Sequence, residues 1–356
     1  MVRFVHSADW QLGAPNMPLA CQRPLTALVD AAHIEKAPFI VCAGDVFHKH
    51  SPDQQTKDYL LQTILSNPDI FFVFMAGNHD YINKERDYTS LKYISLLSRH
   101  KKVTNAYVIE PGRYITFKNA IFWALDEWDD IKNVQAPKDK SKPTIAIWHG
   151  IVPGINVKNV NYDEEKQKEH SNQLLESGID YIALGDIHKQ FKLNDRCYYS
   201  GALTQTSYVD DLGALFVTVE KDNVTVKPLR LDLPKKVSFA VEYREGKDTE
   251  EDIITFVKEN VRNNNLVKIK FNLPLEIYSA INKSYVEEQL KTYCLAVVFD
   301  NDPIMVARSR KNIKQMTQAA TFEQEIDIVL ADEDFDLDKN EIKKRILDIV
   351  THTEVE

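Results

Sequence analysis

Five short stretches of this sequence carry aspartate, asparagine or histidine directly after a hydrophobic run. The polar residues in them are Asp9 and Gln11, Asp45 and His48, Asn78, His79 and Asp80, His149, and Asp186 and His188. A single aspartate after glycine is commonly a turn residue, and a single loop histidine commonly lies on the surface. These ordinary interpretations do not explain why the same residue types follow five hydrophobic runs, so the pattern favours one shared site.

The chemistry that suits this set is metal binding coupled to hydrolysis. Carboxylates, an amide oxygen and imidazoles together favour Mn²⁺, Fe²⁺ or Zn²⁺ over Ca²⁺. More than four such ligands indicate two metals about 3.5–4 Å apart that share a carboxylate, polarise a phosphoryl oxygen and activate water for in-line attack. A histidine outside the metal shell can protonate the leaving alkoxide. His79, with Asp80 beside it to orient the ring, is suited to this catalytic role.

Buried strands are expected to position these side chains. The runs VRFVHSA, FIVCAG, FFVFMAG, TIAIW and YIALG are typical of buried strands, and helical patterns such as QQTKDYLLQTIL lie between them. This alternation predicts βαβ units and a layered α/β fold. Because ligands of such folds bind at the carboxyl ends of the strands, the polar tips should converge there. Residues 214–231 are typical of a β-hairpin.

A second, smaller unit is expected after residue 235. The strand-like runs VSFAVEY, LVKIKFNL and CLAVVFD alternate with two helical patterns, one capped by Thr249 and Asp252 and one by Ser284 and Glu287. We therefore assign residues 1–235 to the main domain and 236–305 to an α+β accessory domain. Residues 306–320 are predicted to form a basic linker, and 321–356 to form amphipathic helices that pack on the body or dock on a partner.

Composition limits the classes of function. The net charge of −9 provides no global field that would attract nucleic acid, so a nucleic-acid site would need a local patch. Candidates are Lys49, His50, Arg308, Arg310 and Lys311, each of which could equally be an ordinary solvated residue. No apolar run approaches the roughly 20 residues of a membrane span, and the N-terminus lacks a signal-peptide pattern. The four scattered cysteines are typical of reduced thiols. We expect a cytoplasmic protein with no membrane partner.

The five motifs resemble those of the calcineurin-like metallophosphoesterase superfamily, which run D-x-H, G-D, G-N-H-D/E, H and G-H-x-H. Within it, AGDVFHKHSPD, AGNHD and ALGDIHK are most similar to the SbcD family, the nuclease subunits of SbcCD-type complexes. The G-D-x-x-D-R-G motif of the superfamily's protein phosphatases does not occur. The resemblance covers residues 1 to about 230. It implies a metallophosphoesterase β-sandwich flanked by helices, a DNA-capping domain over 236–305, and C-terminal helices.

The resemblance also implies roles for individual residues. The first metal would be held by Asp9, Asp45 and His188, and the second by the bridging Asp45 with Asn78 and His149. His79 would be the catalytic histidine, and His48 a further histidine near the scissile phosphate. The implied activity is Mn²⁺-dependent cleavage of DNA duplex ends and hairpins in repair, recombination or replication, with Mg²⁺ as a possible substitute. The implied partners are DNA, a coiled-coil SbcC-type ATPase bound by the C-terminal helices, and a second copy of the chain. The expected setting is a bacterial or phage-infected cell.

Two positions depart from the family motifs. Gln11 stands where D-x-H has its histidine, and Asp186 stands where G-H-x-H has its first histidine. Glutamine offers a neutral and weaker oxygen, whereas aspartate adds a negative charge and a hard ligand. We expect an active nuclease, because Asp45, His79 and His149 are all present. The alternatives are a nucleotide phosphodiesterase or phosphatase, and a weakly active or non-catalytic scaffold that binds DNA ends.

Overall fold

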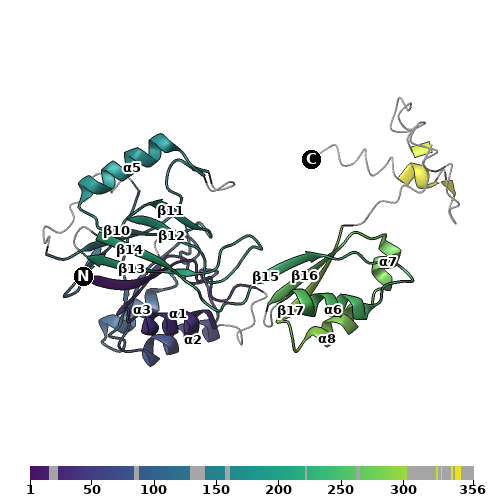
Figure 1. The fold of residues 1–356 in the computed structure, drawn as a ribbon, viewed down its shortest axis with the longest axis horizontal. Coiled ribbons are helices and arrows are strands. Elements are labelled where there is room, and N and C mark those ends of the chain that lie inside the picture. Colours follow the sequence, from purple (N-terminus) through teal and green to yellow (C-terminus); the bar gives the residue numbers. More distant parts are fainter. Residues whose placement is uncertain are drawn as a thin grey trace. The chain divides into compact units, whose positions relative to one another are not determined.

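Strand β1 (Val2–Ser7) lies inside a six-stranded sheet, as its nearly complete burial requires. The computed structural model in Figure 1 describes residues 1–15, 23–83, 88–128, 141–156, 161–220, 223–261, 265–302, 326–327, 330, 338–339 and 341–345. The other strands of this sheet are β2 (Phe39–Ala43), β3 (Phe71–Met75), β4 (Ala106–Val108), β13 (Ala214–Glu220) and β14 (Asn223–Leu229). The order is β14-β13-β1-β2-β3-β4, and β1 to β4 are parallel. The predicted hairpin is confirmed as the β13–β14 pair.

A second six-stranded sheet has the order β11-β12-β10-β7-β6-β5. Its strands are β5 (Tyr114–Thr116), β6 (Ile121–Ala124), β7 (Thr144–His149), β10 (Tyr181–Gly185), β11 (Gln190–Asn194) and β12 (Cys197–Ser200). The short strands β8 (Ile155–Asn156) and β9 (Asn161–Tyr162) pair separately. The five predicted strands are confirmed, but they are divided between two sheets, three in the first and two in the second.

The two sheets pack face to face. Phe4 of β1 makes edge contacts with Phe122 of β6 and with Tyr181 of β10, and both partners belong to the second sheet. Helices α1 (Arg23–Ile34), α2 (Gln54–Ser66) and α3 (Lys92–Arg99) supply buried residues to the hydrophobic cluster on the outer face of the first sheet. Helix α5 (Glu164–Ser177) lies beside β11 (Figure 1). The predicted layered α/β sandwich with flanking helices is therefore confirmed.

A buried histidine joins the two sheets near the site. His6 of β1 is fully buried; its Nδ1 lies 2.9 Å from the Tyr181 hydroxyl and its Nε2 3.1 Å from the Leu184 carbonyl oxygen. The carbonyl requires Nε2 to donate, so Nδ1 accepts from the tyrosine. Burial lowers the pKa of His6 to about 3, and the ring is neutral at physiological pH.

The segment after residue 235 contains a three-stranded sheet. Its order is β15 (Lys236–Ala240), β16 (Leu266–Phe271) and β17 (Ala296–Asn301), with helices α6 (Glu250–Asn260), α7 (Leu275–Ala280) and α8 (Lys283–Leu290). The capping box of Thr249 and Asp252 is confirmed. The cap predicted for the last helix is wrong: Asn282 caps α8 by accepting from the Tyr285 amide, because the helix begins earlier than Ser284. Sequence patterns also missed the short α7.

The chain divides into two compact units, Met1–Lys270 with Asn282–Asp300, and Phe271–Ile281 with Asn301–Glu356. The predicted domain limits at 235 and 305 stay predictions. Arg308, Arg310, Lys311 and the predicted linker lie outside the described residues, as does most of the predicted C-terminal helical segment. In the part of the chain that is described, no helix is both long enough and apolar enough to cross a bilayer.

Candidate metal centre

The strand ends of both sheets meet at one place. Asp9, Asp45 and Asn78 follow β1, β2 and β3, while His149 ends β7 and Asp186 follows β10. Backbone hydrogen bonds join the loops, with the Asp9 amide donating to the Gly44 carbonyl and the Gln11 amide to the Asp45 carbonyl. The Asp186 amide donates to Asp9 Oδ2 across the two sheets, at 3.1 Å. The tips therefore converge as predicted, although the topology that brings them together is a sandwich.

A buried carboxylate–imidazole cluster lies at this point. One ligand atom each of Asp9, Asp45 and His149 lies within 4.8 Å of the others. His149 Nε2 is 3.4 Å from Asp45 Oδ1 and 2.9 Å from Asn78 Oδ1. The surrounding predicted ligands also approach: His188 Nε2 is 3.4 Å from Asp9 Oδ1, and Asp186 Oδ1 is 3.8 Å from His149 Nε2. The structure thus brings the predicted metal residues together, including Gln11, whose side-chain Nε2 lies 2.9 Å from Asp45 Oδ2.

The histidines of the site share one orientation. His149 Nδ1 lies 2.7 Å from the Ala43 carbonyl, His79 Nδ1 lies 2.7 Å from the His48 carbonyl, and His188 Nδ1 lies 3.1 Å from Asp210 Oδ2. An oxygen acceptor at Nδ1 requires that nitrogen to carry the proton. Each Nε2 is consequently available to a ligand, on the side that faces Asp9 or Asp45.

One buried oxygen in the cluster lacks a hydrogen-bond partner. Asp9 is completely buried, and its Oδ1 receives no hydrogen bond. His188 Nε2 lies 3.4 Å from this oxygen without forming a hydrogen bond, and a buried carboxylate oxygen that accepts no hydrogen bond is costly. A divalent cation shared by Asp9, Asp45 and the imidazoles would satisfy this oxygen with hard and borderline donors that suit Mn²⁺ or Mg²⁺. The residues present therefore fit the expected metal ions.

The electrostatics of the cluster also favour a cation. Burial opposes charge on His149, but the carboxylates of Asp45, Asp9 and Asp186 raise its pKa to about 10. Burial likewise opposes charge on His188, but the hydrogen bond to Asp210 and the negative charges of Asp9 and Asp210 raise its pKa to about 10. Both imidazoles thus sit in a strongly negative potential, and metal binding would have to displace a proton from each.

Three glycines give His149 the space that it occupies. A Cβ added to Gly44 would lie 2.1 Å from His149 Nδ1, and one added to Gly77 would lie 2.8 Å from His149 Nε2 and 2.2 Å from Asp45 Oδ1. A Cβ on Gly185 would lie 2.8 Å from His149 Nδ1. These glycines immediately precede Asp45, Asn78 and Asp186, so each motif begins with a residue that leaves the imidazole room.

Backbone strain is concentrated at the site. Of the six described non-glycine residues with positive φ, four are Asp9 (51°), Gln11 (48°), Asp45 (52°) and Asp186 (93°). Left-handed conformations cost non-glycine residues of order 1–3 kcal/mol and persist where the surrounding structure enforces them. The loop hydrogen bonds enforce them here and aim the side chains at one point.

The side-chain amide of Gln11 contacts two other residues of the site. Its Nε2 donates to Asp45 Oδ2 at 2.9 Å, and its Oε1 lies 2.9 Å from His48 Nδ1. Both ends of the amide are therefore engaged by protein groups, and the oxygen that was expected to face a metal faces His48. The prediction that Gln11 is a metal ligand remains a prediction, but the structure shows it linking a central carboxylate to a histidine.

Asp80 does not contact the His79 ring in the predicted way. It is fully buried, and its carboxylate accepts hydrogen bonds from the amides of Val46, Phe47 and Gly77. Burial, together with the nearby Asp45 charge, raises the pKa of Asp80 to about 6 despite these bonds. The orienting contact expected from Asp80 comes instead from the His48 carbonyl, because Asp80 points inward and ties two motif loops together.

The predicted substrate-side residues lie on more exposed segments. The His79 side chain is 42% exposed, and its Nε2 is 3.9 Å from Asp45 Oδ2. The His48 and His79 rings are 5.7 Å apart, and burial and the His79 charge lower the pKa of His48. Lys49 and His50 are exposed on the same loop, and His50 lines a pocket of about 360 Å³ with Lys57 and Tyr88.

The calcineurin-like phosphoesterase family matches residues 2–190, the part of the chain that carries all five motifs. The chain belongs to this family. The family implies metal-dependent hydrolysis of phosphoesters, and the sequence resemblance is confirmed at that level. A relative, the D subunit of the nuclease SbcCD of Staphylococcus saprophyticus, is 23% identical over 272 residues, which cover 64% of this chain and 70% of that protein.

Solved structures that match part of this chain include TT1561 of Thermus thermophilus, with 10% identity, coverage of 64% of this chain and 99% of that one, and a TM-score of 0.41. A dimetal phosphatase from Danio rerio has 12% identity, coverage of 64% and 95%, and a TM-score of 0.38. Likenesses at these scores support no conclusion about function.

Sequence reasoning missed Asp210, which orients His188. Asp210 Oδ2 accepts from the amides of Thr206 and Ser207 and lies 3.1 Å from His188 Nδ1. Asp210 lies beyond the five motifs, and its contact with His188 depends on how the loop after β12 folds back toward β10. The glycines before the motif residues are visible in the sequence, but the close approach of His149 that requires them is a property of the fold.

Proposed function

We propose that this chain is a two-metal phosphodiesterase that cleaves DNA, as the nuclease subunit of an SbcCD-like complex. The observation that supports the chemistry best is the buried cluster of Asp9, Asp45 and His149, in which one carboxylate oxygen accepts no hydrogen bond. DNA as the substrate is supported by the relative named as the D subunit of the nuclease SbcCD. The domain over 236–305 would then cap the DNA, and residues 321–356 would bind an SbcC-type ATPase, with a homodimer as the working form.

The residues divide into holders of metal and groups that meet the substrate. Asp45 would lie between two cations, with Asp9 and His188 on one side, and Asn78, His149 and Asp186 on the other. Such a pair of divalent ions, Mn²⁺ or Mg²⁺, supplies charge neutralisation at the phosphoryl group and acidifies the attacking water.

The remaining steps belong to the protein. Because its Nδ1 is held by the His48 carbonyl, His79 directs Nε2 toward the carboxylates, 3.9 Å from Asp45 Oδ2, where its imidazolium form can donate a proton to the leaving alkoxide. The His48 ring, whose Nδ1 donates to Gln11 Oε1, lies 5.7 Å from the His79 ring and would contact a phosphate oxygen through Nε2 when that nitrogen is also protonated. The exposure of His79 next to the buried carboxylates allows a phosphodiester to reach both.

The experiment compares His79→Ala with His33→Ala on a labelled DNA duplex in Mn²⁺. His33 lies on α1 outside the site, and its side chain is 43% exposed against 42% for His79, which makes it a matched control. Loss of the general acid should lower the cleavage rate about 10²–10⁴-fold without loss of bound metal, and the control should cleave normally. Cleavage by His79→Ala within a few-fold of wild type would refute the assignment.

Metal content and substrate preference separate the alternatives. About two Mn²⁺ ions per chain, measured by elemental analysis, support the catalytic proposal, whereas a chain that binds DNA ends without metal would be the scaffold. Faster turnover of nucleotides than of DNA would indicate the nucleotide phosphodiesterase. No cleavage in Mn²⁺, Mg²⁺ or Co²⁺, with or without an SbcC-type ATPase, would exclude the nuclease.

A further inference from the structure

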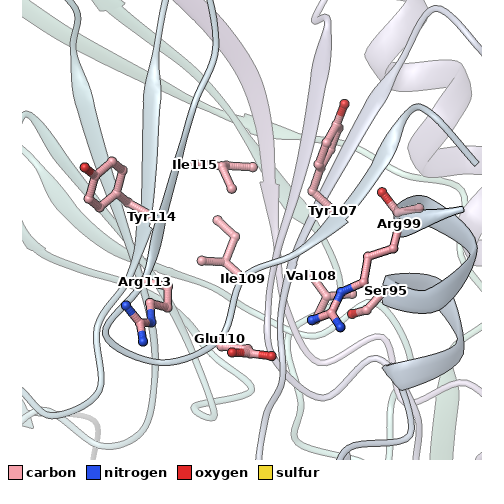
Figure 2. Close-up of a pocket in the computed structure, with 10 residues that line it drawn as sticks. Ser95, Arg99, Tyr107, Val108, Ile109, Glu110, Arg113, Tyr114 and Ile115 are labelled. Atoms are coloured by element: carbon pink, nitrogen blue, oxygen red, sulfur yellow. The ribbon is translucent and has the colours of Figure 1, made fainter. Parts of the chain in front are cut away.

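A second pocket, of about 230 Å³, lies between helix α3 and strands β4 and β5. Figure 2 shows Arg99 on the helix side, Arg113 and Tyr114 on the β5 side, and Glu110 between the two arginines. The floor is apolar and includes Ile109, which is 2% exposed. None of these residues belongs to the metal cluster or to the five motifs.

Strand order places this pocket on the same rim as the metal centre. Strand β4 is parallel to β2 and β3 and lies two strands from β2, so its end, like theirs, is at the carboxyl edge. Strand β5 is antiparallel to β6, so its first residue, Tyr114, pairs with Trp123 near the carboxyl end of β6. Strand β5 itself lies two strands from β7 in the second sheet. Neighbouring strands are about 4.8 Å apart, so two strands span roughly 10 Å. The pocket therefore lies about that far along the rim from β2, which precedes Asp45, and from β7, which ends at His149.

The pocket carries two cations from separate elements. Arg99 and Arg113 are exposed, and neither forms an ion pair with another described residue. A basic residue at the C-terminus of α3 is favoured by the helix dipole alone, which would account for Arg99 without any ligand. That explanation does not apply to Arg113, which lies in the turn before β5.

The turn that carries Arg113 is rigidly held. The Arg113 amide donates to the Glu110 carbonyl, its carbonyl accepts from the Ala124 amide, and the Gly112 amide donates to the Ala124 carbonyl. The arginine is therefore presented by a fixed backbone. Tyr114 follows it with 53% of its surface exposed, an aromatic ring with no described ring partner beside a cation.

We propose that this pocket binds the phosphate backbone of the DNA strand whose scissile phosphate lies at the metal centre. The inference rests on the proposed function. Each strand of a DNA duplex carries a phosphate about every 3.4 Å of helix axis, so the pocket would meet the strand about three nucleotides from the cleavage point. The two guanidinium groups contact phosphate, and the Tyr114 ring stacks on a base or sugar.

Glu110 gives this proposal an opposite-signed test. A carboxylate between two phosphate-binding arginines repels the strand, so removal of its charge should strengthen binding. Arg99→Ala with Arg113→Ala should weaken binding and lower the slope of log affinity against log salt by about 0.9 for each lost contact, or about 1.8 together. Glu110→Gln should bind DNA more tightly at low salt and show a steeper slope.

The assay is fluorescence anisotropy of a labelled blunt duplex between about 50 and 200 mM salt, with His79→Ala present in every variant to prevent cleavage. Arg230→Ala is the matched control, because Arg230 is exposed and follows β14, the opposite edge strand of the same sheet. It should leave the slope unchanged. If the double alanine variant melts early, the pair Arg99→Gln and Arg113→Gln replaces it and must give the same change in slope.

An unchanged slope in the double variant, or an equal loss in Arg230→Ala, would overturn the inference. So would weaker binding by Glu110→Gln. If the slope is unchanged while wild-type protein still cleaves DNA, the proposal for the pocket fails and the nuclease stands. If the wild-type chain neither binds nor cleaves DNA, the proposed function fails and the pocket proposal falls with it.

Discussion

Replacement of Gly44 by alanine tests whether the space around His149 creates the metal site. The new Cβ would lie 2.1 Å from His149 Nδ1 and 2.8 Å from the His149 Cβ. Since the close contact includes the root of the side chain, rotation of the imidazole cannot relieve it. The ring has to move away from its present contacts, in which Nδ1 is 2.7 Å from the Ala43 carbonyl oxygen and Nε2 is 3.4 Å from Asp45 Oδ1.

Two costs contribute, and a control separates them. Gly44 has φ +92°, and a left-handed conformation costs alanine about 1–2 kcal/mol. The steric overlap adds about 1–3 kcal/mol, the usual range for overpacking of a core. Gly178→Ala introduces the same residue at φ +76° with nothing within 4 Å of the new Cβ. It should therefore be destabilised by the backbone cost alone.

The assay measures unfolding in urea and Mn²⁺ binding by calorimetry for both variants. We expect Gly44→Ala to lose about 2–5 kcal/mol of stability and to bind Mn²⁺ at least tenfold more weakly, whereas Gly178→Ala loses about 1–2 kcal/mol and binds normally. Wild-type Mn²⁺ affinity in Gly44→Ala would refute the argument that this glycine exists to seat His149. Equal destabilisation of the two variants would show that backbone strain alone matters.

Three further changes have defined outcomes. The pKa of His6 is lowered to about 3 in the folded chain, so as the pH falls below 6.5 the unfolded chain takes up a proton that the folded chain does not. The free energy of unfolding of the wild type should therefore fall by up to about 5 kcal/mol between pH 6.5 and 3. Urea titrations of His6→Gln should show a smaller fall. Asp80→Asn leaves one acceptor oxygen for the three backbone amides that now donate to the carboxylate. It should lower the free energy of unfolding in urea by roughly 3 kcal/mol. A loss below about 1 kcal/mol would contradict the role of Asp80 in joining the motif loops. Thr249→Ala removes the capping box of α6 and should lower stability by about 1 kcal/mol in thermal melts, whereas Thr255→Ala, within the same helix, should not.

The strands were predictable because the local pattern determines them. Runs such as FIVCA and YIALG are buried along their whole length, as interior parallel strands require, and both ended where the sequence places a glycine and an aspartate. The partition into two sheets was not predictable in this way. It depends on which strand pairs with which, for example β10 with β7 and β12, and pairing between distant segments leaves no mark on either run alone.

The same distinction applies to the site. Types and spacing identified Asp9, Asp45, Asn78 and His149, since each lies at the end of a strand or within three residues after it. The contacts that orient these groups involve backbone carbonyls and loops, such as Ala43 for His149, and any residue can supply a carbonyl. The sequence therefore predicts the side chains that could bind metal better than it predicts the groups that orient those side chains.

The two departures from the family motifs offset each other in physical terms. Glutamine at position 11 removes an imidazole donor, but its amide both donates to Asp45 and accepts from His48, which a single imidazole facing a metal would not do. Aspartate at position 186 adds a negative charge to the site. Burial and the neighbouring carboxylates of Asp9 and Asp45 raise its pKa, because the charges repel one another. A divalent cation would reduce that repulsion. Gln11 thus links Asp45 to His48, while Asp186 adds a carboxylate to the cluster, 3.8 Å from His149 Nε2. A chain that had simply lost its chemistry would not be expected to retain an oriented Nε2 on each of His79, His149 and His188.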